Sequence, residues 1–184
     1  MKLFKISDFK QYSDFYIESG SCMGESIKRA LQGEFQNIQS VEIHEPYYDF
    51  CMDQYGTNEK VTLYLGDTVQ VLPMMLEKTG DQKAVIFLDA HPAGSGTATH
   101  DDLIKNGKKS EFLQDTILKK ELAMILAHRN DHVILIDDQN GANGENKKYI
   151  KMIKKVNPGY KFYFIDEQLE NGILHKEKIL ICLT

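Results

Sequence analysis

The chain has 184 residues, of which 42% are hydrophobic and 27% are charged, and its net charge at pH 7 is −5. This length and balance predict one soluble domain over residues 1–184 and exclude a disordered chain. No apolar run approaches the roughly 20 residues that would span a bilayer, and the first 12 residues lack the apolar core of a signal peptide, so we expect a cytoplasmic protein.

Apolar runs and helical stretches alternate along the chain. The runs AVIFL and HVILI are apolar throughout, as expected of strands that are buried on both faces of a parallel sheet. Thr68 follows the third expected strand and is placed to cap the next helix. In chain order, the expected elements are strand Phe15–Ile17, helix Met23–Leu31, strand Ile38–Ile43, helix Tyr47–Tyr55, strand Val61–Leu65, the helix after Thr68, strand Ala84–Leu88, helix Phe112–His128, strand His132–Ile136, helix Tyr149–Val156, and strands Lys161–Ile165 and Lys178–Leu183.

The order of these elements indicates the fold class. Five strand–helix units followed by two neighbouring strands are typical of an α/β fold with a mostly parallel sheet. The turn residues Glu170, Asn171 and Gly172 separate the last two strands. These two strands could therefore form an antiparallel hairpin at one end of the sheet.

Carboxylates follow each of the first five expected strands. They are Glu18, Glu42, Asp67, Asp89 and the pair Asp137–Asp138. In an open α/β sheet, ligands bind at the carboxyl ends of the strands. One carboxylate at a strand end means little, but a carboxylate at every strand end indicates a ligand site at this edge.

The turn after the first strand has the sequence ESGSCMG over residues 18–24. A dinucleotide-binding turn needs a further glycine, and Cys22 occupies an expected place for it. Glu18 at the head of the turn disfavours an anionic pyrophosphate. The turn suits a ligand with a cationic amine and sugar hydroxyls, such as S-adenosylmethionine, whose ribose hydroxyls Glu42 can accept.

Five motifs, taken in order, resemble those of class I S-adenosylmethionine-dependent methyltransferases over nearly the whole chain. More narrowly, they are similar to those of the small metal-dependent O-methyltransferases of the catechol type and the related sugar O-methyltransferases. The resemblance implies a Rossmann-like three-layer sandwich with a seven-stranded, mostly parallel sheet and a C-terminal antiparallel hairpin. The motifs are IESGSCMGES at residues 17–26, Val41-Glu42-Ile43, Gly66-Asp67-Thr68, Phe87-Leu88-Asp89-Ala90-His91 and Leu135-Ile136-Asp137-Asp138.

The same resemblance implies methyl transfer from S-adenosylmethionine to an oxygen of a small molecule, for instance a sugar. Asp89 would contact the amino group of the cofactor, a metal ion or both. The implied cofactor-binding residues are Glu18, Gly20, Ser21, Gly24, Ser26, Glu42, Ile43, Asp67, Thr68 and Asp89.

Asp89, Asp137 and Asp138 are candidate metal ligands. Adjacent strands lie roughly 4.8 Å apart, so carboxylates at the ends of the fourth and fifth strands can converge on one ion. Mg²⁺ prefers oxygen ligands and keeps several waters, and it would make an acceptor hydroxyl easier to deprotonate. The alternative is that Asp137 and Asp138 cap a loop while Asp89 holds only the amino group of the cofactor.

His91 and Asp89 are the candidate catalytic residues. His91 stands two residues after Asp89, in a region where the catechol-type enzymes carry a basic lysine, so the sequence departs from their pattern here. A histidine can take a proton from a hydroxyl near pH 7. The alternative is that His91 only orders the Gly-rich loop over residues 92–99.

The expected partner is a small hydroxyl-bearing acceptor. Few residues precede the first strand to cover it, so a second subunit could complete the acceptor site in a homodimer. The acidic composition, with Arg29 and Arg129 as the two arginines, disfavours nucleic acid. Two alternatives stay open: a nucleotide- or NAD-binding enzyme on the same fold, and a catalytically inactive methyltransferase-like binding subunit.

Overall fold

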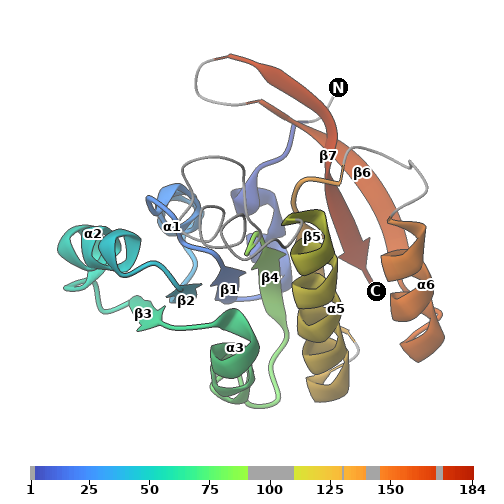
Figure 1. The fold of residues 1–184 in the computed structure, drawn as a ribbon, viewed down its shortest axis with the longest axis horizontal. Coiled ribbons are helices and arrows are strands. Elements are labelled where there is room, and N and C mark those ends of the chain that lie inside the picture. Colours follow the sequence, from blue (N-terminus) through green and yellow to red (C-terminus); the bar gives the residue numbers. More distant parts are fainter. Residues whose placement is uncertain (1–2, 91–109, 130, 140–145, 169–171) are drawn as a thin grey trace.

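The computed structural model describes residues 3–90, 110–129, 131–139, 146–168 and 172–184. Its strands form one seven-stranded sheet in the order β3-β2-β1-β4-β5-β7-β6 (Figure 1). The strands are β1 Phe15–Ser19, β2 Asn37–Glu42, β3 Val61–Leu65, β4 Ala84–Leu88, β5 Val133–Ile136, β6 Lys161–Gln168 and β7 Leu174–Leu183. The helices are the 3₁₀ helix η1 Ile6–Tyr12 and the α-helices α1 Glu25–Gln32, α2 Glu45–Tyr55, α3 Thr68–Glu77, α5 Ser110–His128 and α6 Lys147–Val156.

The first five strands are parallel, and β7 runs antiparallel to both of its neighbours, β5 and β6. β1 lies between β2 and β4, so all five carboxyl ends meet at one edge of the sheet. β4 is buried at each of its five residues, which explains why its sequence is apolar throughout. The predicted fold class is confirmed, including the antiparallel pair at the C-terminal end.

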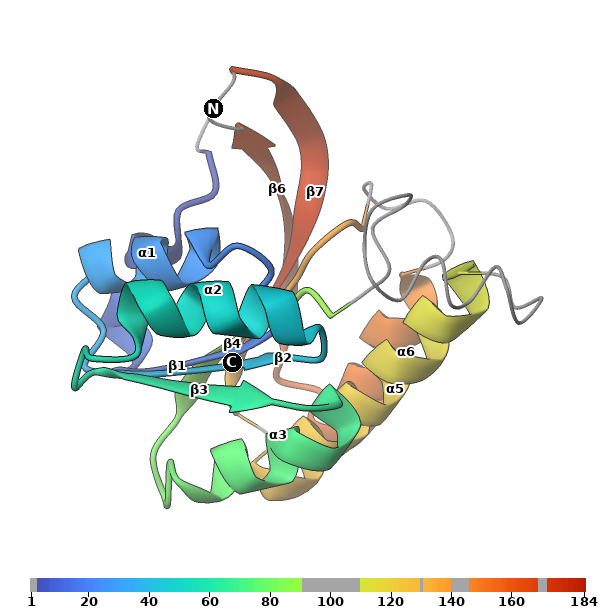
Figure 2. The same cartoon turned by 60° about the vertical axis from the view of Figure 1, so that its left-hand side comes forward.

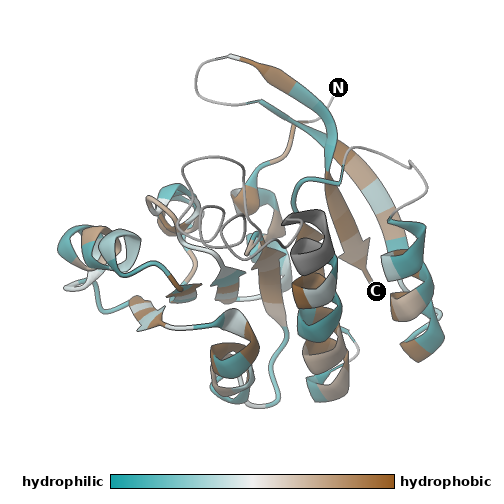
Figure 3. Ribbon diagram, in the orientation of Figure 1, coloured by the Kyte–Doolittle hydropathy of each residue, from teal (hydrophilic) through white to brown (hydrophobic). Residues whose placement is uncertain are grey.

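Helices cover both faces of the sheet, which gives three layers. Figure 2 shows α1 and α2 on one side of the strands and α3 and α5 on the other. A buried cluster on the α1 side includes Phe35, Ile38 and Val85, and a second on the α3 side includes Leu72, Leu122 and Ile134. Figure 3 shows brown apolar positions along β4 and along the C-terminal half of β7, whereas α6 alternates between apolar and polar positions.

The observed strands β1, β6 and β7 are longer than the runs that predicted them, while β3 and β4 match their predicted bounds. β1 continues past Ile17 because Glu18 and Ser19 still pair with β2 and β4; Glu18 stands opposite Ser40 on one side and Phe87 on the other. Hydrophobic pattern alone ends a strand at its first polar residue. The backbone continues here because two neighbours saturate its hydrogen bonds.

The predicted cap of α3 is wrong by one residue. Asp67, and not Thr68, is the N-cap, because its side chain accepts a hydrogen bond of 2.8 Å from the backbone N–H of Val69. Thr68 is the first helical residue, and its buried hydroxyl donates to Glu121 on α5 over 2.9 Å. The Asp67 carboxylate also complements the positive end of the α3 dipole.

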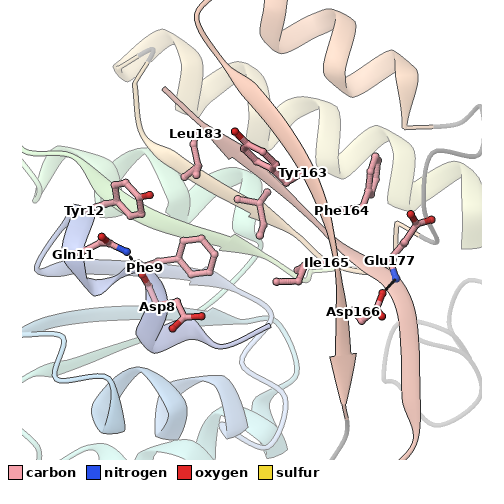
Figure 4. Close-up of a pocket in the computed structure, with 11 residues that line it drawn as sticks. Asp8, Phe9, Gln11, Tyr12, Tyr163, Phe164, Ile165, Asp166, Glu177 and Leu183 are labelled. Atoms are coloured by element: carbon pink, nitrogen blue, oxygen red, sulfur yellow. Dashed lines mark hydrogen bonds between the residues drawn. The ribbon is translucent and has the colours of Figure 1, made fainter. Parts of the chain in front are cut away.

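A groove of about 590 Å³ lies between η1 and the β6–β7 pair (Figure 4). Phe9 and Tyr12 line it from η1, Tyr163 and Ile165 line it from β6, and Asp166 marks one end. No predicted site residue lines this groove. Within the described ranges, no helix has the length and apolar character needed to cross a membrane.

Candidate functional site

The turn from β1 to α1 is built around two glycines. Gly20 has φ +85°, and a Cβ atom there would lie 2.8 Å from the backbone oxygen of Asp89. Gly24 has φ +74° at the N-cap of α1, and a Cβ atom there would lie 2.6 Å from the Tyr55 ring. Both contacts are closer than a side chain tolerates, so the turn requires glycine and brings its backbone against the end of β4.

Glu18 lies at the end of β1 and is fully buried. Its carboxylate accepts hydrogen bonds from the hydroxyls of Ser26 on α1 and Ser40 on β2, the second over 2.7 Å. The hydroxyls of Ser40 and Ser21 are also hydrogen-bonded to each other. Burial raises the pKa of Glu18 to about 8, against the lowering effect of the Ser40 hydrogen bond, and the nearby Glu42 carboxylate raises it further.

The Glu42 side chain, at the end of β2, accepts hydrogen bonds from two backbone N–H groups. One carboxylate oxygen accepts from the N–H of Cys22 in the first turn, and the other accepts from the N–H of His44, each over 2.8 Å. A carboxylate oxygen can accept more than one hydrogen bond, so these contacts leave capacity for a ligand's hydroxyls. The side chain thus joins the first two strand ends into one surface.

Large apolar side chains stand exposed at the same edge. Ile43 after β2 is 54% exposed, Leu65 at the end of β3 is 45% exposed, and Met23 in the first turn is 49% exposed. Exposed apolar side chains beside buried carboxylates match a ligand with a flat apolar ring and polar substituents. Of these three residues, only Ile43 is among the cofactor-binding residues that the resemblance implied.

Asp67 and Thr68, which were expected to line the adenine, have their own partners inside the protein. Asp67 caps α3, while the Thr68 hydroxyl is turned toward α5. Their part in cofactor binding stays a prediction. The backbone of the Gly66 turn is anchored by a hydrogen bond of 2.8 Å from the Gly66 N–H to the carbonyl oxygen of Glu42.

Asp89 follows β4 and stands between the turn from β1 to α1 and the end of β5. Its backbone N–H donates to the carbonyl oxygen of Ser19 over 3.1 Å. Burial raises the pKa of the Asp89 side chain well above its usual range, and the carboxylates of Asp137 and Glu18 raise it further. The structure therefore brings together the carboxylates that the sequence placed at the ends of β1, β4 and β5.

Asp137 and Asp138 lie at the end of β5, and a lysine holds both. The ammonium group of Lys178, on β7, is 3.3 Å from an oxygen of Asp137 and 3.6 Å from an oxygen of Asp138. It also donates to Glu167 on β6 over 3.0 Å. Glu167 in turn accepts from Arg29 on α1 over 2.9 Å, so a chain of charges runs from α1 to the end of β5.

This arrangement does not fit a divalent metal. Among the residues that the structure describes, no group of three or more His, Cys, Asp or Glu side chains could hold a metal ion. The cation beside Asp137 and Asp138 is an ammonium group from the chain itself. His91, the candidate base, lies outside the described residues, as does the loop that follows it.

Two contributors to this site were not predicted from the sequence. Ser40 gave little signal, because it stands between other polar residues, Gln39 and Glu42, in the expected strand. Lys178 gave none, because it begins an apolar run as an ordinary surface lysine would. Its position beside Asp137 follows from β7 lying next to β5, and that adjacency is a property of strand order.

Solved structures share this fold. Rv0187 from MTB, solved with a cofactor bound, has a TM-score of 0.57 at 14% identity, covering 95% of this chain and 74% of that chain. The O-methyltransferase TomG of Streptomyces achromogenes, involved in tomaymycin synthesis and bound to SAM, gives 0.55 at 12% identity, covering 95% and 74%. The Bacillus cereus O-methyltransferase in complex with SAH gives 0.52 at 15% identity, covering 95% and 76%.

In its fold, the chain resembles the class I S-adenosylmethionine-dependent methyltransferases, as the motifs predicted. No family model matches the sequence. No curated protein matches it by sequence. Strand order separates this fold from the dinucleotide-binding one, whose usual order is 3-2-1-4-5-6 in a parallel sheet, because here the antiparallel β7 is inserted between β5 and β6.

Proposed function

We propose that this protein is an S-adenosylmethionine-dependent methyltransferase that methylates an oxygen of a small molecule such as a sugar. The observation that carries the proposal is the pair of buried carboxylates, Glu18 and Glu42, at the ends of two adjacent strands beside a glycine-fixed turn. Carboxylates attract the cationic amine of the cofactor and accept its ribose hydroxyls.

The cofactor fits the residues that are present. Gly20 and Gly24 have no side chains, so the backbone of the first turn packs closely against its neighbours at the two positions where a Cβ atom would clash. Ser26 donates to the Glu18 carboxylate, and the Ser21 hydroxyl is hydrogen-bonded to that of Ser40, which itself donates to Glu18. When bound, S-adenosylmethionine supplies a methyl group on a sulfonium centre, and Ile43 with Leu65 offers apolar surface for its adenine.

On the acceptor side, Asp89 and the end of β5 orient the hydroxyl that is methylated. We assign Asp89 to the amino group of the cofactor, because it is the carboxylate between the first turn and the acceptor side. We assign His91 to the proton that the acceptor hydroxyl must lose. Magnesium has no place in this proposal, because Lys178 already pairs with Asp137 and Asp138. A homodimer and a cytoplasmic location stay predictions of the sequence.

Calorimetry with S-adenosylhomocysteine tests the proposal. The wild-type protein should bind it, and Glu42→Gln should weaken binding at least about tenfold, since hydrogen bonds to a charged group contribute roughly 1.5–3 kcal/mol each. Glu45→Gln is the matched control, because Glu45 is an exposed carboxylate at the start of α2. Binding of NAD in place of S-adenosylhomocysteine would instead support the nucleotide-binding alternative. Absence of binding by either ligand would support a binding subunit without this cofactor.

Transfer of a labelled methyl group from S-adenosylmethionine tests the reaction itself. A panel of sugars and other small hydroxyl compounds should include an acceptor that becomes labelled. A protein that binds the cofactor and labels none of a broad panel, but labels RNA or protein, would overturn the acceptor class while leaving the cofactor site intact.

A further inference from the structure

Lys178 is a lysine in the interior, surrounded by carboxylates. Its side chain is 14% exposed, while those of Asp137 and Glu167 are 8% and 7% exposed. Burial of a lone ammonium group is costly, and close carboxylates offset that cost. Consistent with this, the charges of Asp137, Glu167 and Asp138 raise the pKa of Lys178 above its usual range, although burial acts in the opposite direction.

Three carboxylates surround the Lys178 ammonium group, which donates a hydrogen bond of 3.0 Å to Glu167 and forms ion pairs with Asp137 and Asp138. An ammonium group has three N–H bonds, and three carboxylates lie within 3.6 Å of this nitrogen, from Glu167, Asp137 and Asp138. Asp137 is further fixed by a hydrogen bond of 2.7 Å that its other oxygen accepts from the N–H of Asp138. The two aspartates at the end of β5 therefore already have a cationic partner.

A divalent ion would have to compete with this ammonium group. Mg²⁺ needs near-octahedral oxygen ligands at about 2.0–2.1 Å, and a second cation within a few ångströms of Lys178 would be repelled in a partly buried site. Asp137 cannot turn both oxygens to a metal while it holds Lys178 and the Asp138 N–H.

We propose that the Lys178 ammonium is the resident cation of the carboxylate cluster at the end of β5, and that it excludes a divalent metal from Asp89, Asp137 and Asp138. The inference does not depend on the reaction that the protein catalyses. It assigns Lys178 a positioning role, since its contacts hold Asp137 and Asp138 in place at the acceptor side.

Binding of Mn²⁺, followed by electron paramagnetic resonance on the full chain, tests the proposal without an activity assay. Wild-type protein should bind Mn²⁺ no better than Asp138→Asn does. Lys178→Met keeps the unbranched apolar part of the side chain without its charge, and it should bind one Mn²⁺ at least about tenfold more tightly than wild type. Lys176→Met is the matched control, because Lys176 is exposed on the same strand, and it should behave as wild type.

The gained site should disappear again when Asp138→Asn is added to Lys178→Met. If Lys178→Met does not fold, the double variant Glu167→Gln with Lys178→Met replaces it in the test. The double variant removes one buried negative charge together with the positive one. A wild-type protein that binds Mn²⁺ and loses it through Asp138→Asn overturns the proposal. A folded Lys178→Met protein that gains no Mn²⁺ site also overturns it.

Discussion

Glu18 is a buried carboxylate whose ionisation opposes the stability of the fold. Its pKa of about 8 in the folded protein lies above the ordinary value of 4.5. The folded state therefore binds more protons than the unfolded state between these values, and stability falls as the pH rises from about 4.5 through about 8. Glu18→Gln should remove this loss, so its melting temperature at pH 8 should exceed that of wild type, as measured by thermal unfolding from pH 5 to pH 9.

Above about pH 8, where wild-type Glu18 is ionised, the same substitution should also weaken S-adenosylmethionine binding, because it removes one of the negative charges that the proposal places near the cationic cofactor. Glu45→Gln provides the control for both readouts, since Glu45 is exposed. If the melting temperatures of Glu18→Gln and wild type change in the same way between pH 5 and pH 9, then Glu18 ionises as it does in water. The interpretation of its burial would then be wrong.

His91 carries the proton-transfer part of the proposal. His91→Asn should lower kcat by about a hundredfold or more, which is the usual contribution of a general base, while S-adenosylhomocysteine should bind as tightly as it does to wild type. Single-turnover kinetics and calorimetry measure the two quantities separately. His175→Asn, on exposed β7, is the control. An unchanged kcat would transfer the base role to one of the strand-end carboxylates.

At the scale of elements, the start of β5 is held by a neutral histidine. The backbone N–H of Ala84 on β4 donates to Nδ1 of buried His132 over 2.9 Å, so that nitrogen carries no proton, and the other ring nitrogen faces His128 over 3.2 Å. Burial, together with the charge of His128, lowers the pKa of His132 to about 4, from 6.5. The arrangement couples the pairing of β4 with β5 to pH.

Because its folded-state pKa is depressed, His132 is protonated more readily in the unfolded chain, so stability should be lost as the pH falls from about 6.5 toward about 4. The full difference corresponds to about 3 kcal/mol. His132→Asn keeps an acceptor near Ala84 but cannot titrate, so urea unfolding of this variant should depend less on pH in that range. If wild type and His132→Asn lose the same stability as the pH falls, a group other than His132 is responsible.

Most elements followed from the sequence, because apolar runs mark β4 and β5 and regularly spaced apolar positions mark α1 and α6. The errors have physical causes: Glu18 and Ser19 extend β1 through backbone pairing, and Asp67 outcompetes Thr68 as a cap because its carboxylate reaches the N–H of Val69. The carboxylate edge was predictable, since parallel strands bring their ends together. The partner of Asp137 was not, because Lys178 reaches it only through strand order.

At the scale of the whole molecule, the sheet has a protected centre and a weaker edge. β4 is buried at every residue and paired on both sides, whereas β3 pairs only with β2 in the described sheet and is partly exposed along its length. Amide hydrogen exchange should therefore be slowest in β4 and its neighbours β1 and β5, and faster in β3 and in residues 174–177 of β7. Mass-spectrometric exchange on the ligand-free protein measures this order, and β3 amides as slow as those of β4 would contradict it.

The placement of β7 between β5 and β6 also bears on how the sheet is made during synthesis. β6 is translated before β7, yet in the described sheet β7 is the one strand that it pairs with, apart from an isolated bridge between Asp166 and Leu3. Until β7 is in place, β6 therefore has no strand of the sheet to join, and the outer side of β5 stays unpaired. A nascent chain paused between these two strands carries an open parallel sheet and a free amphipathic segment. Such a species pairs readily with other chains, so we expect the chain to be most prone to aggregation before β7 has paired with β5.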